Sequence, residues 1–416
     1  MSKQELLLRN VRLETGFVRD KNNQVIATKT ALFDMHITNG KIKTINAKGQ
    51  LKNTTQHNNE NDTQKVKTID ANGLLMLPTF QDMHVHIDKT YYGGDWQAAP
   101  WTGDIKHMIR LEEDLIPKLL PDSQRRAEAC IQLLQSYGST FARCHCNIDP
   151  VSGLRSLEHL QLALDKYKDS FTWEIAAFPQ HGILYSQSEG LLREAAQMDI
   201  GFIGGLDPTI VDDDMKKSLD VMFDIALDYD KGVDIHLHEG LPSGKAVMKH
   251  MIQRVKESPS LQGKTFITHA YALAMLPEIE LEDIAVQFAE YGIGIISSIP
   301  IGSNALPIPT LTKHQVNVRA GTDNIMDNFS PFGSGDMLQK ANVCAQLYGW
   351  TDEYRLNRAL KMITDQPLPL DDQGKQVWPL VGDDADFILV KASCSAEAVA
   401  RLPKREAVYY KGNSIY

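Results

Sequence analysis

The middle of the chain alternates short apolar runs with longer segments of helical periodicity. Between most of these runs, apolar residues recur every three or four positions, as in 122–138 and 152–168, which predicts amphipathic helices. Strands that alternate with helices are typical of a parallel sheet. Eight such runs predict a closed (β/α)8 TIM-like barrel of the α/β class. They cover 74–86, 139–145, 173–179, 200–207, 232–238, 265–269, 293–300 and 317–323.

Both ends of the chain have a different pattern. The first 75 residues contain short alternating strands separated by Asn-Gly and Gly turns, and residues 376–416 return to the same pattern. We therefore expect a small β-sandwich domain composed of residues 1–75 and 376–416, and a barrel composed of residues 76–375. Residues 51–66 are polar and almost without apolar anchors, so we expect a mobile surface loop there.

Polar residues gather where the predicted barrel strands end. In barrel enzymes the carboxyl ends of the strands form the active site. A single histidine at such a position is usually structural, whereas the coincidence on several strands favours a functional site. Seven of the thirteen histidines lie at or just after a predicted strand end: His84, His86, His145, His181, His236, His238 and His269.

Four of the residues at the strand ends form a candidate metal site. His84 and His86 alternate along one strand, so both imidazoles point to the same side and can share one cation. His236 ends the fifth strand and Asp323 ends the eighth. Three imidazoles and one carboxylate suit Zn²⁺ or Fe²⁺ better than Mg²⁺ or Ca²⁺. The fourth strand does not end in lysine, which leaves no candidate for a modified lysine that bridges two metals. We therefore expect one divalent metal ion per chain.

Hydrolysis is the expected chemistry of such a site. A bound divalent cation lowers the pKa of its water and supplies hydroxide near neutral pH. Glu239 lies first in the loop after the fifth strand, and we assign it general acid and base work on a ring nitrogen. A solvated loop carboxylate is the alternative interpretation. We expect His269 to orient the hydroxide, and Asp323 to shuttle a proton while it binds the metal.

Six segments of the chain resemble the amidohydrolase superfamily, and within it the cytosine deaminase subgroup. They are PTFQDMHVHIDKT, FARCHCNID, AAFPQHGIL, DIHLHEG, ITHAYAL and GTDNIMDNFSPFGSGDML. The resemblance implies the same four metal ligands, proton transfer by Glu239 and an attacking water held by His269. It also implies that Gln180 hydrogen-bonds the amide edge of the substrate. A glutamine that only stabilises its loop is the alternative.

Some positions depart from the cytosine deaminase pattern. Asn324 stands where those enzymes have a second aspartate, and Phe329 stands where they have tryptophan. The pair of Asp323 and Asn324 resembles the triazine aminohydrolases, which remove amines or alkylamines from triazine rings. His238 lies between the metal ligand and Glu239. We therefore expect His238, Asn324 and Phe329 to contact a pyrimidine-like or triazine-like ring, and we expect cytosine to be a poor substrate.

Two other functions fit parts of this pattern. A hydrolase of the same superfamily would open a cyclic amide or imide, but a glutamate placed to protonate a ring nitrogen favours removal of an exocyclic amine. A catalytically silent, metal-binding barrel is the second alternative. Loss of Glu239, His269 or Asp323 would favour it, and all three are present.

The composition limits the partners of the protein. The chain has 416 residues and a formal net charge of −10, so no basic face is available for nucleic acid. No run of eighteen apolar residues occurs, and the first residues have no secretion signal. We expect a cytoplasmic homo-oligomer that acts on a small molecule, without nucleic acid or membrane partners. The five cysteines include no Cys-x-x-Cys pair, which predicts reduced thiols. Cys144 and Cys146, on either side of His145, are expected to pack in the barrel wall.

Overall fold

The computed structural model describes residues 5–49, 66–100, 103–364 and 368–416. The chain divides into two compact units, of which the first contains residues 1–81, 134–140 and 336–416. The second contains residues 82–133 and 141–335. Residues 336–375, which we expected in the barrel, group with the chain ends in this division. The expected surface loop at 51–66 lies outside the described residues except for Val66.

Eight strands form the barrel sheet, in the order β6, β7, β8, β9, β10, β11, β12 and β13. Neighbouring strands such as β9 and β10 pair in parallel. Each of the eight apolar runs overlaps one of these strands, which confirms the predicted barrel. Val85 bridges Asp323 in parallel, so the end of the sheet returns to its beginning. The strands are Phe80–Val85 (β6), Ser139–Asn147 (β7), Thr172–Phe178 (β8), Phe202–Leu206 (β9), Gly232–His236 (β10), Thr265–Thr268 (β11), Ile293–Ser297 (β12) and Val318–Ala320 (β13).

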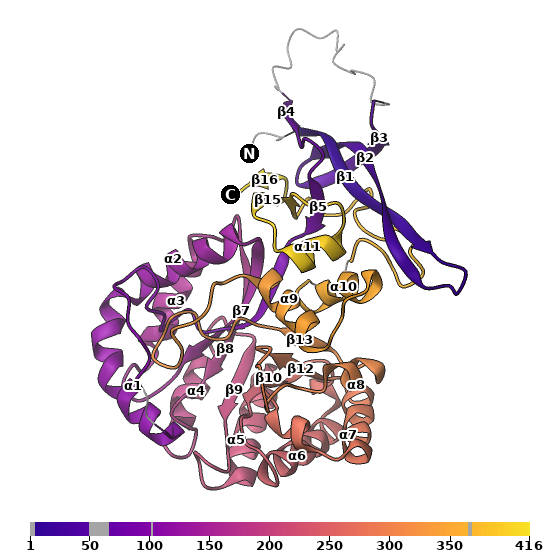
Figure 1. Cartoon of the computed structure of the whole chain (residues 1–416). Helices are drawn as coiled ribbons and strands as arrows, with labels where there is room; N and C mark the ends of the chain where they lie inside the picture. Colours follow the sequence, from indigo (N-terminus) through magenta and orange to yellow (C-terminus); the bar gives the residue numbers. More distant parts are fainter. Residues whose placement is uncertain (1–4, 50–65, 101–102, 365–367) are drawn as a thin grey trace. The chain divides into compact units, whose positions relative to one another are not determined.

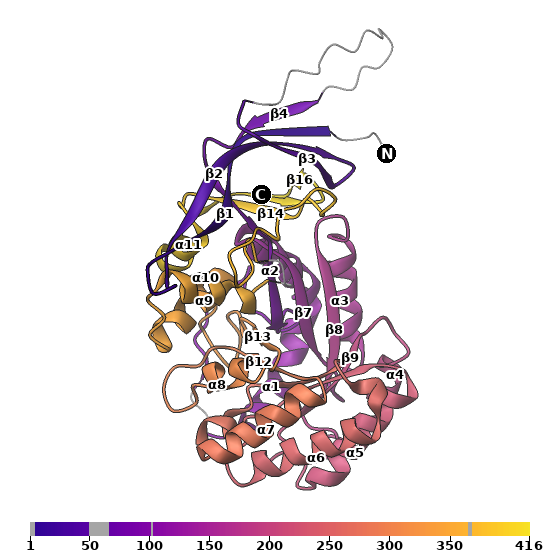
Figure 2. The same ribbon diagram turned by 90° about the vertical axis from the view of Figure 1, so that its right-hand side faces the viewer.

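Helices connect the barrel strands and lie outside them (Figures 1 and 2). The helices predicted at 122–138 and 152–168 are α2 and α3. Helix α5 shows how the sequence fixes a helix. Asp214 caps its first turn, because the Asp214 carboxylate accepts a hydrogen bond from Lys217 N at 3.1 Å. Leu219, Met222 and Ala226 then recur on its buried face. The helices are Ile105–Leu119 (α1), Ser123–Ser136 (α2), Arg155–Asp165 (α3), Glu189–Ala195 (α4), Met215–Asp228 (α5), Ser243–Glu257 (α6), Glu278–Glu290 (α7) and Ile308–Lys313 (α8), with short 3-10 turns at Leu120–Asp122, Pro259–Leu261 and Tyr271–Met275.

The two chain ends form a separate sheet, as predicted. Its order is β16, β15, β14, β5, β1, β2 and β3, and β4 pairs with β1. The predicted run 74–86 therefore holds two strands, because β5 belongs to this sheet and β6 to the barrel. The strands are Glu5–Arg19 (β1), Val25–Thr38 (β2), Lys41–Ala47 (β3), Lys67–Asp70 (β4), Leu75–Pro78 (β5), Phe387–Val390 (β14), Arg405–Tyr410 (β15) and Asn413–Ser414 (β16).

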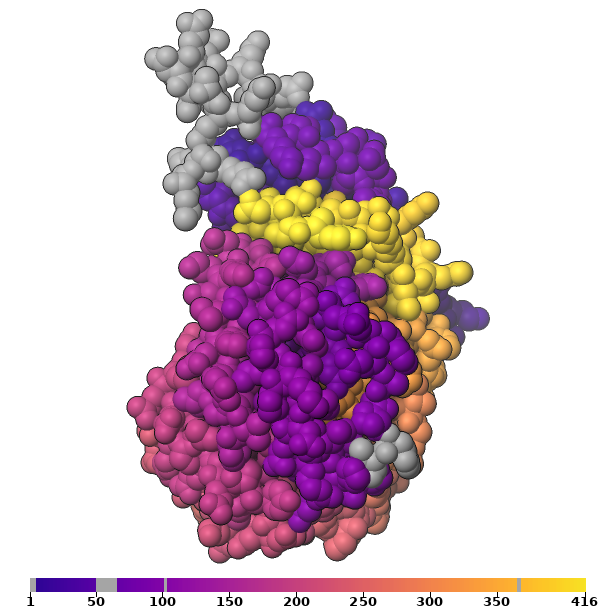
Figure 3. Space-filling view, turned by 90° about the vertical axis from the view of Figure 1, so that its left-hand side faces the viewer, coloured from indigo at the N-terminus to yellow at the C-terminus, as the bar shows by residue number. Residues whose placement is uncertain are grey.

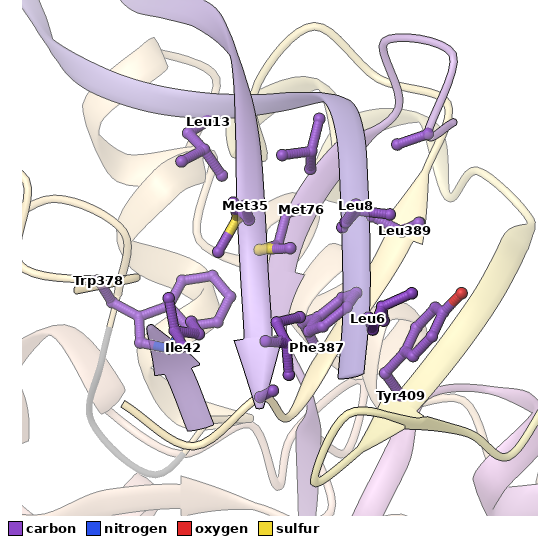
Figure 4. Close-up of a cluster of buried hydrophobic side chains, with 14 residues drawn as sticks. Leu6, Leu8, Leu13, Met35, Ile42, Met76, Trp378, Phe387, Leu389 and Tyr409 are labelled. Atoms are coloured by element: carbon purple, nitrogen blue, oxygen red, sulfur yellow. The ribbon is translucent and has the colours of Figure 1, made fainter. Parts of the chain in front are cut away.

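Apolar side chains from both ends of the chain make one core in this unit (Figure 4). Leu6 and Leu8 alternate along β1 and contribute to a cluster that also contains Met76, Phe387 and Tyr409. Alternation places them on one face of the strand. The rings of Phe387 and Tyr409 stack with centroids 4.5 Å apart. The described residues of this unit also form three helices and one 3-10 turn: Met337–Leu347 (α9), Glu353–Ala359 (α10), Ser395–Arg401 (α11) and Leu360–Met362.

The cysteines are free and buried, in agreement with the prediction of reduced thiols. Cys144 and Cys146 lie in β7 and are fully buried. Burial raises the pKa of both thiols, so they are poor nucleophiles. Across the described ranges, every helix is too short or too polar to pass through a bilayer.

Candidate active site

The carboxyl ends of the barrel strands bring together five predicted site residues. His84 lies in β6 and His86 directly follows it, while His236 ends β10. His269 follows β11 and Asp323 follows β13. The ring centroids of His84 and His236 lie 4.5 Å apart, and those of His236 and His269 lie 5.4 Å apart. We call these five side chains the histidine cluster.

Contacts between β6 and the segment after β13 close the barrel at this point. Asp323 N donates to His84 O at 2.7 Å. Thr322 N donates to Asp82 Oδ1 at 2.9 Å. Gly321 permits the close approach, because a Cβ at this position would lie 2.5 Å from the Cβ of His84. Closure therefore fixes the carboxylate of Asp323 against the His-x-His pair.

Three pairs of ligand atoms in the histidine cluster lie at distances that occur in tetrahedral metal sites. Asp323 Oδ1 lies 3.3 Å from His84 Nε2 and 3.6 Å from His86 Nε2. His86 Nε2 lies 3.2 Å from His236 Nε2. Ligand atoms at about 2.1 Å from one tetrahedral ion are about 3.4 Å apart. These three separations are close to that value.

The cluster also lacks the hydrogen bonds that buried polar groups need. In the described part of the chain, nothing forms a hydrogen bond with the buried Nε2 atom of His84 or with the buried Nδ1 atoms of His84, His236 and His269. Burial lowers the pKa of His86 and His236 well below the usual value, so both rings are neutral and available as metal ligands. A buried polar group without a partner costs about 1 to 3 kcal/mol. The residues present therefore fit a divalent metal ion, which would satisfy part of this deficit.

His145 is a further histidine that packs against the cluster. Its ring centroid lies 4.1 Å from that of His84 and 4.8 Å from that of His236. Its Nε2 lies 3.5 Å from Asp234 Oδ2. We placed His145 at a strand end but gave it no ligand role. Among the described residues, two sets of three side chains have ligand atoms close enough to share an ion, namely His84, His145 and His236, and His84, His269 and Asp323.

Glu239 is buried, with 1% of its surface exposed. Its Oε1 accepts from Thr209 N at 2.7 Å and from Ile210 N at 3.3 Å. Its Oε2 is buried, and no described residue forms a hydrogen bond with it. The loop after β9 therefore holds one carboxylate oxygen and leaves the other available. This arrangement does not agree with a solvated loop carboxylate, the alternative interpretation of Glu239.

His238 lies beside His269, and their rings stack with centroids 4.3 Å apart. His238 Nδ1 lies 2.8 Å from Asp207 Oδ2. Burial lowers the pKa of His238, but Asp207 outweighs this effect and raises it. The backbone φ values of Asp207, His269 and Asp323 are 34°, 71° and 68°. Residues other than glycine rarely adopt such values, and those that do are concentrated at functional sites.

A second group of buried polar side chains surrounds Lys89. Lys89 Nζ donates to Gln180 Oε1 at 2.6 Å and lies 3.1 Å from Glu112 Oε1. Glu112 Oε2 lies 3.1 Å from His181 Nε2. We call these four side chains the Lys89 cluster. Of its members we had predicted a role only for Gln180, although Lys89 lies in the HIDKT sequence after the His-x-His pair.

The Lys89 cluster keeps its central ion pair charged although it is buried. Burial lowers the pKa of Lys89, but Glu112 and other carboxylates outweigh it and raise the value. Burial raises the pKa of Glu112, but Lys89 and His181 outweigh it and lower the value. Each partner thus stabilises the charge of the other, as expected for a buried pair with additional hydrogen bonds.

Asn324 and Phe329 lie in the loop after β13. Asn324 Nδ2 donates to Asp327 Oδ2 at 2.6 Å. Asp327 Oδ1 accepts from the backbone N of Phe329 at 2.8 Å and of Ser330 at 3.0 Å. The ring of Phe329 lies 4.5 Å from Lys89 Nζ, which is a cation–π contact. Three residues predicted to bind substrate, Gln180, Asn324 and Phe329, are therefore connected through Lys89 and Asp327.

Phe178, the last residue of β8, contacts both clusters. Its ring stacks on that of His236 with centroids 3.8 Å apart. Lys89 Nζ lies 5.9 Å from the centroid of the same ring. The candidate metal ligands and the candidate substrate residues therefore lie close together.

The segment after β6 forms one face of the second unit. It is purple in Figure 3, and the surface is hollowed among these residues. A cavity of about 170 Å³ is lined by residues 91–97 and by Met326. The loops that follow β6 and β13 are therefore open to solvent at this cavity.

Comparison with known proteins supports the resemblance found in the sequence. A model described as the amidohydrolase family matches residues 150–416. The uncharacterized protein YahJ of Escherichia coli (strain K12) is 48% identical over 411 residues, which cover 98% of this chain and 87% of that protein. The predicted membership of the amidohydrolase superfamily is therefore confirmed.

Two solved structures have the same fold over almost the whole chain. The structure of N-isopropylammelide isopropylaminohydrolase from Burkholderia multivorans is 26% identical, covers 99% of this chain and 98% of its own, and gives a TM-score of 0.83. The structure of 5-methylcytosine deaminase from Klebsiella pneumoniae is 22% identical, covers 99% of this chain and 97% of its own, and gives a TM-score of 0.78. Triazine and cytosine enzymes are thus its neighbours, as predicted.

Proposed function

The chain belongs to the amidohydrolase family and is a hydrolase of carbon–nitrogen bonds other than peptide bonds, and from this premise we propose that it removes ammonia or an alkylamine from a small nitrogen heterocycle. The short separations of three pairs of ligand atoms in the histidine cluster, 3.2 to 3.6 Å, are the observation that carries the proposal. A ring of the pyrimidine or triazine type is the proposed substrate.

In this proposal His84, His86, His236 and Asp323 hold one Zn²⁺ or Fe²⁺ ion. Such an ion, when bound, supplies Lewis acidity that makes water nucleophilic near neutral pH. His269 belongs to a second set of side chains whose ligand atoms lie close together, and the other two are His84 and Asp323. His269 Nε2 is 3.9 Å from Asp323 Oδ2, a position from which it can orient a water molecule without replacing a ligand.

Glu239 transfers protons in the proposed reaction. The amides of Thr209 and Ile210 hold Oε1, so Oε2 accepts the proton that leaves the attacking water. The same oxygen then protonates the ring nitrogen or the departing amine. Asp323 assists by accepting a proton late in the reaction. Transfer by one positioned carboxylate contributes about 10² to 10⁴ in rate.

The proposed leaving group is an amine attached to the ring, and it departs either as ammonia or as an alkylamine. One of the similar structures described above is named an isopropylaminohydrolase and the other a deaminase. An alkylamine and ammonia are therefore both candidates for the leaving group. His238, Gln180, Asn324 and Phe329 are the side chains that we propose to contact the ring. Phe329 gives this side of the pocket an apolar surface that suits an alkyl group.

Amine release measures the proposed function directly. Protein loaded with Zn²⁺ or Fe²⁺ is incubated with aminopyrimidines, aminopterins and amino- or alkylamino-triazines, and ammonia and alkylamines are quantified separately. We expect release from at least one of these classes. Glu239→Gln protein, loaded in the same way, is the control for amine release that does not depend on the carboxylate of Glu239. Opening of the ring without amine release, or no turnover in any class, would contradict the proposal.

A further inference from the structure

The loops after β9 and β10 begin side by side, because their strands are neighbours in the barrel. Leu206, the last residue of β9, pairs with His236, the last residue of β10. Asp207 N then donates to His236 O at 3.1 Å, so the parallel pairing continues for one more residue. Asp207 therefore lies directly beside the segment that leads from His236 to Glu239.

The carboxylate of Asp207 holds the loop after β10. Its Oδ1 accepts from His238 N at 2.6 Å and from Glu239 N at 3.2 Å. Its Oδ2 lies 2.8 Å from His238 Nδ1. Only 3% of the surface of Asp207 is exposed, and hydrogen bonds to a carboxylate in a buried site are strong. The backbone at His238 and Glu239 is therefore held at two successive amides.

Glu239 holds the loop after β9 in return. Its Oε1 accepts from Thr209 N and Ile210 N. Each of the two carboxylates thus binds backbone amides of the other loop, and we call these contacts the carboxylate clasp. Because the side chain of Glu239 starts from a backbone that Asp207 holds, a shift of that backbone would also move Oε1 and Oε2.

The backbone conformation of Asp207 agrees with this role. Its φ of 34° lies in the left-handed region, where glycine, asparagine and aspartate are the residues found most often. Glycine would adopt this conformation but supply no acceptor for the amides of His238 and Glu239. Aspartate provides both the conformation and the acceptor oxygens.

We propose that Asp207 is a positioning residue for proton transfer, which fixes Glu239 so that Oε2 stays in one place. Oε2 is the oxygen that forms no hydrogen bond with a described residue. The inference rests on the proposed function, in which Glu239 carries the proton. Asp207 transfers no proton itself and acts through Glu239. Since a misplacement of about 1 Å can cost about 10²-fold in rate, loss of Asp207 lowers kcat and leaves KM almost unchanged.

Hydrogen–deuterium exchange resolved to single amides tests the clasp without turnover. Asp207→Gly removes the carboxylate and tolerates the positive φ. In the zinc-loaded variant, the Thr209 amide should exchange about 10-fold faster or more, because its acceptor Glu239 is no longer held. Pro208 has no N–H, so Thr209 is the first exchangeable amide after position 207. An unchanged rate at Thr209 would overturn the inference.

A second pair of proteins separates this effect from looseness that glycine itself introduces. Glu239→Ala removes the acceptor of the Thr209 amide directly. Adding Asp207→Gly to Glu239→Ala should then change the exchange of Thr209 by about threefold or less. An increase as large as the one in protein that retains Glu239 would show that glycine acts on its own loop, and it would also overturn the inference.

Turnover of the best substrate tests the consequence for catalysis. Asp207→Gly should lower kcat by about 10- to 100-fold and change KM by about threefold or less. Asp207→Asn should restore kcat to within about threefold of wild type, because the amide carbonyl accepts from both backbone amides. Asp149→Gly is the matched control, since Asp149 is buried and its Oδ1 accepts from Val151 N and Ser152 N, each at 2.8 Å, in the loop after β7. It should keep kcat within about threefold.

Adding Asp207→Gly to Glu239→Gln shows whether Asp207 acts through Glu239. The residual kcat of Glu239→Gln protein should change by about threefold or less, because the group that Asp207 positions no longer carries a proton. A further loss of 10- to 100-fold, or equal losses of kcat in Asp207→Gly and Asp207→Asn, would contradict a role through the clasp. Absence of amine release by wild-type protein is a different result. Together with faster exchange at Thr209, it would support the clasp and contradict the proposed function.

Discussion

The histidine cluster and the Lys89 cluster are both buried, but they differ in how their polar groups are paired. In the histidine cluster, His86 Nε2 and His236 Nε2 face each other at 3.2 Å, and the buried Nε2 atom of His84 forms no hydrogen bond with the described residues. In the Lys89 cluster, Lys89 and Glu112 lie 3.1 Å apart with opposite charge. The first group therefore fits a bound ion, whereas the second has its charges balanced by the protein alone.

This difference predicts different consequences of mutation. A change in the histidine cluster should alter metal binding and catalysis and leave the fold in place, because in our proposal a bound ion, and not a protein group, completes that cluster. A change in or beside the Lys89 cluster should alter stability and the orientation of neighbouring amides, because it leaves a buried group without its partner. The following variants test this division.

Glu239→Gln should have the largest effect. The amide has the shape of the carboxylate and can keep the hydrogen bonds from Thr209 and Ile210, but it cannot carry a proton. We expect kcat to fall by about 10² to 10⁴, with metal content and unfolding unchanged. Turnover on the best substrate and elemental analysis measure the two properties. If kcat stays within about threefold of wild type, another residue transfers the proton, and His238 is the next candidate.

His86→Ala should reduce the affinity for metal by about 100-fold or more, because loss of a ligand exceeds the 10- to 100-fold effect of an outer partner. We expect wild-type protein purified without chelator to hold about one divalent ion per chain, since its ligand atoms suit a single tetrahedral ion. Elemental analysis and competition with a chromogenic chelator measure these values. His250→Ala is the matched control, because His250 pairs with Asp220 away from the cluster. Two ions per chain would contradict a mononuclear site.

The contrast between the clusters also explains why the sequence predicts the residues of the histidine cluster but not Lys89. His84 and His86 were found because alternate residues of a strand point to one side and parallel strands end at the same edge of a barrel. His236 and Asp323 follow from the same rule. Lys89 was missed because its partner Glu112 lies in α1, at a distance along the chain that no periodicity relates to a strand end. The pairing exists only once the loop after β6 and this helix have folded together.

The boundary between β5 and β6 was missed for a related reason. Residues 74–86 read as one apolar run because the strand Leu75–Pro78 is buried throughout and β6 is almost entirely buried. Alternation of polar and apolar residues, the signal that locates one face of a strand, is therefore absent. The change of sheet depends on pairing with β14 and β1, which the local pattern does not contain.

Asn324→Asp should destabilise the protein by about 1 to 3 kcal/mol, because it places a second carboxylate where Asp327 now accepts a hydrogen bond. The exchange Asn324→Asp with Asp327→Asn should restore most of this stability. The amide introduced at position 327 can donate to the carboxylate introduced at position 324. Its carbonyl can still accept from Phe329 N and Ser330 N, as Asp327 Oδ1 does now. Unfolding in urea measures both variants. Equal stability of the single variant and wild type would show that the hydrogen bond between these side chains contributes nothing.

The smallest expected effect is the dependence on pH that Asp327 introduces. Burial raises the pKa of Asp327 to about 6 although Lys89 opposes this shift. Because the value in the folded state lies above the value of 3.8 taken for an unperturbed aspartate, the folded protein holds this proton more tightly. The stability that this proton contributes is complete below pH 3.8 and is lost as the pH rises through about 6.

The difference in unfolding free energy between wild type and Asp327→Asn should therefore fall with increasing pH. Between the two pKa values the slope is at most about 1.4 kcal/mol for each pH unit, and above pH 7 the difference should be constant. Urea unfolding of both zinc-loaded proteins between pH 4 and pH 8, as round limits, measures it, and effects of the metal ligands cancel in the difference. A difference that grows with pH would mean that Lys89 stabilises the Asp327 carboxylate by more than burial destabilises it, so that the ammonium also determines the charge at the loop after β13.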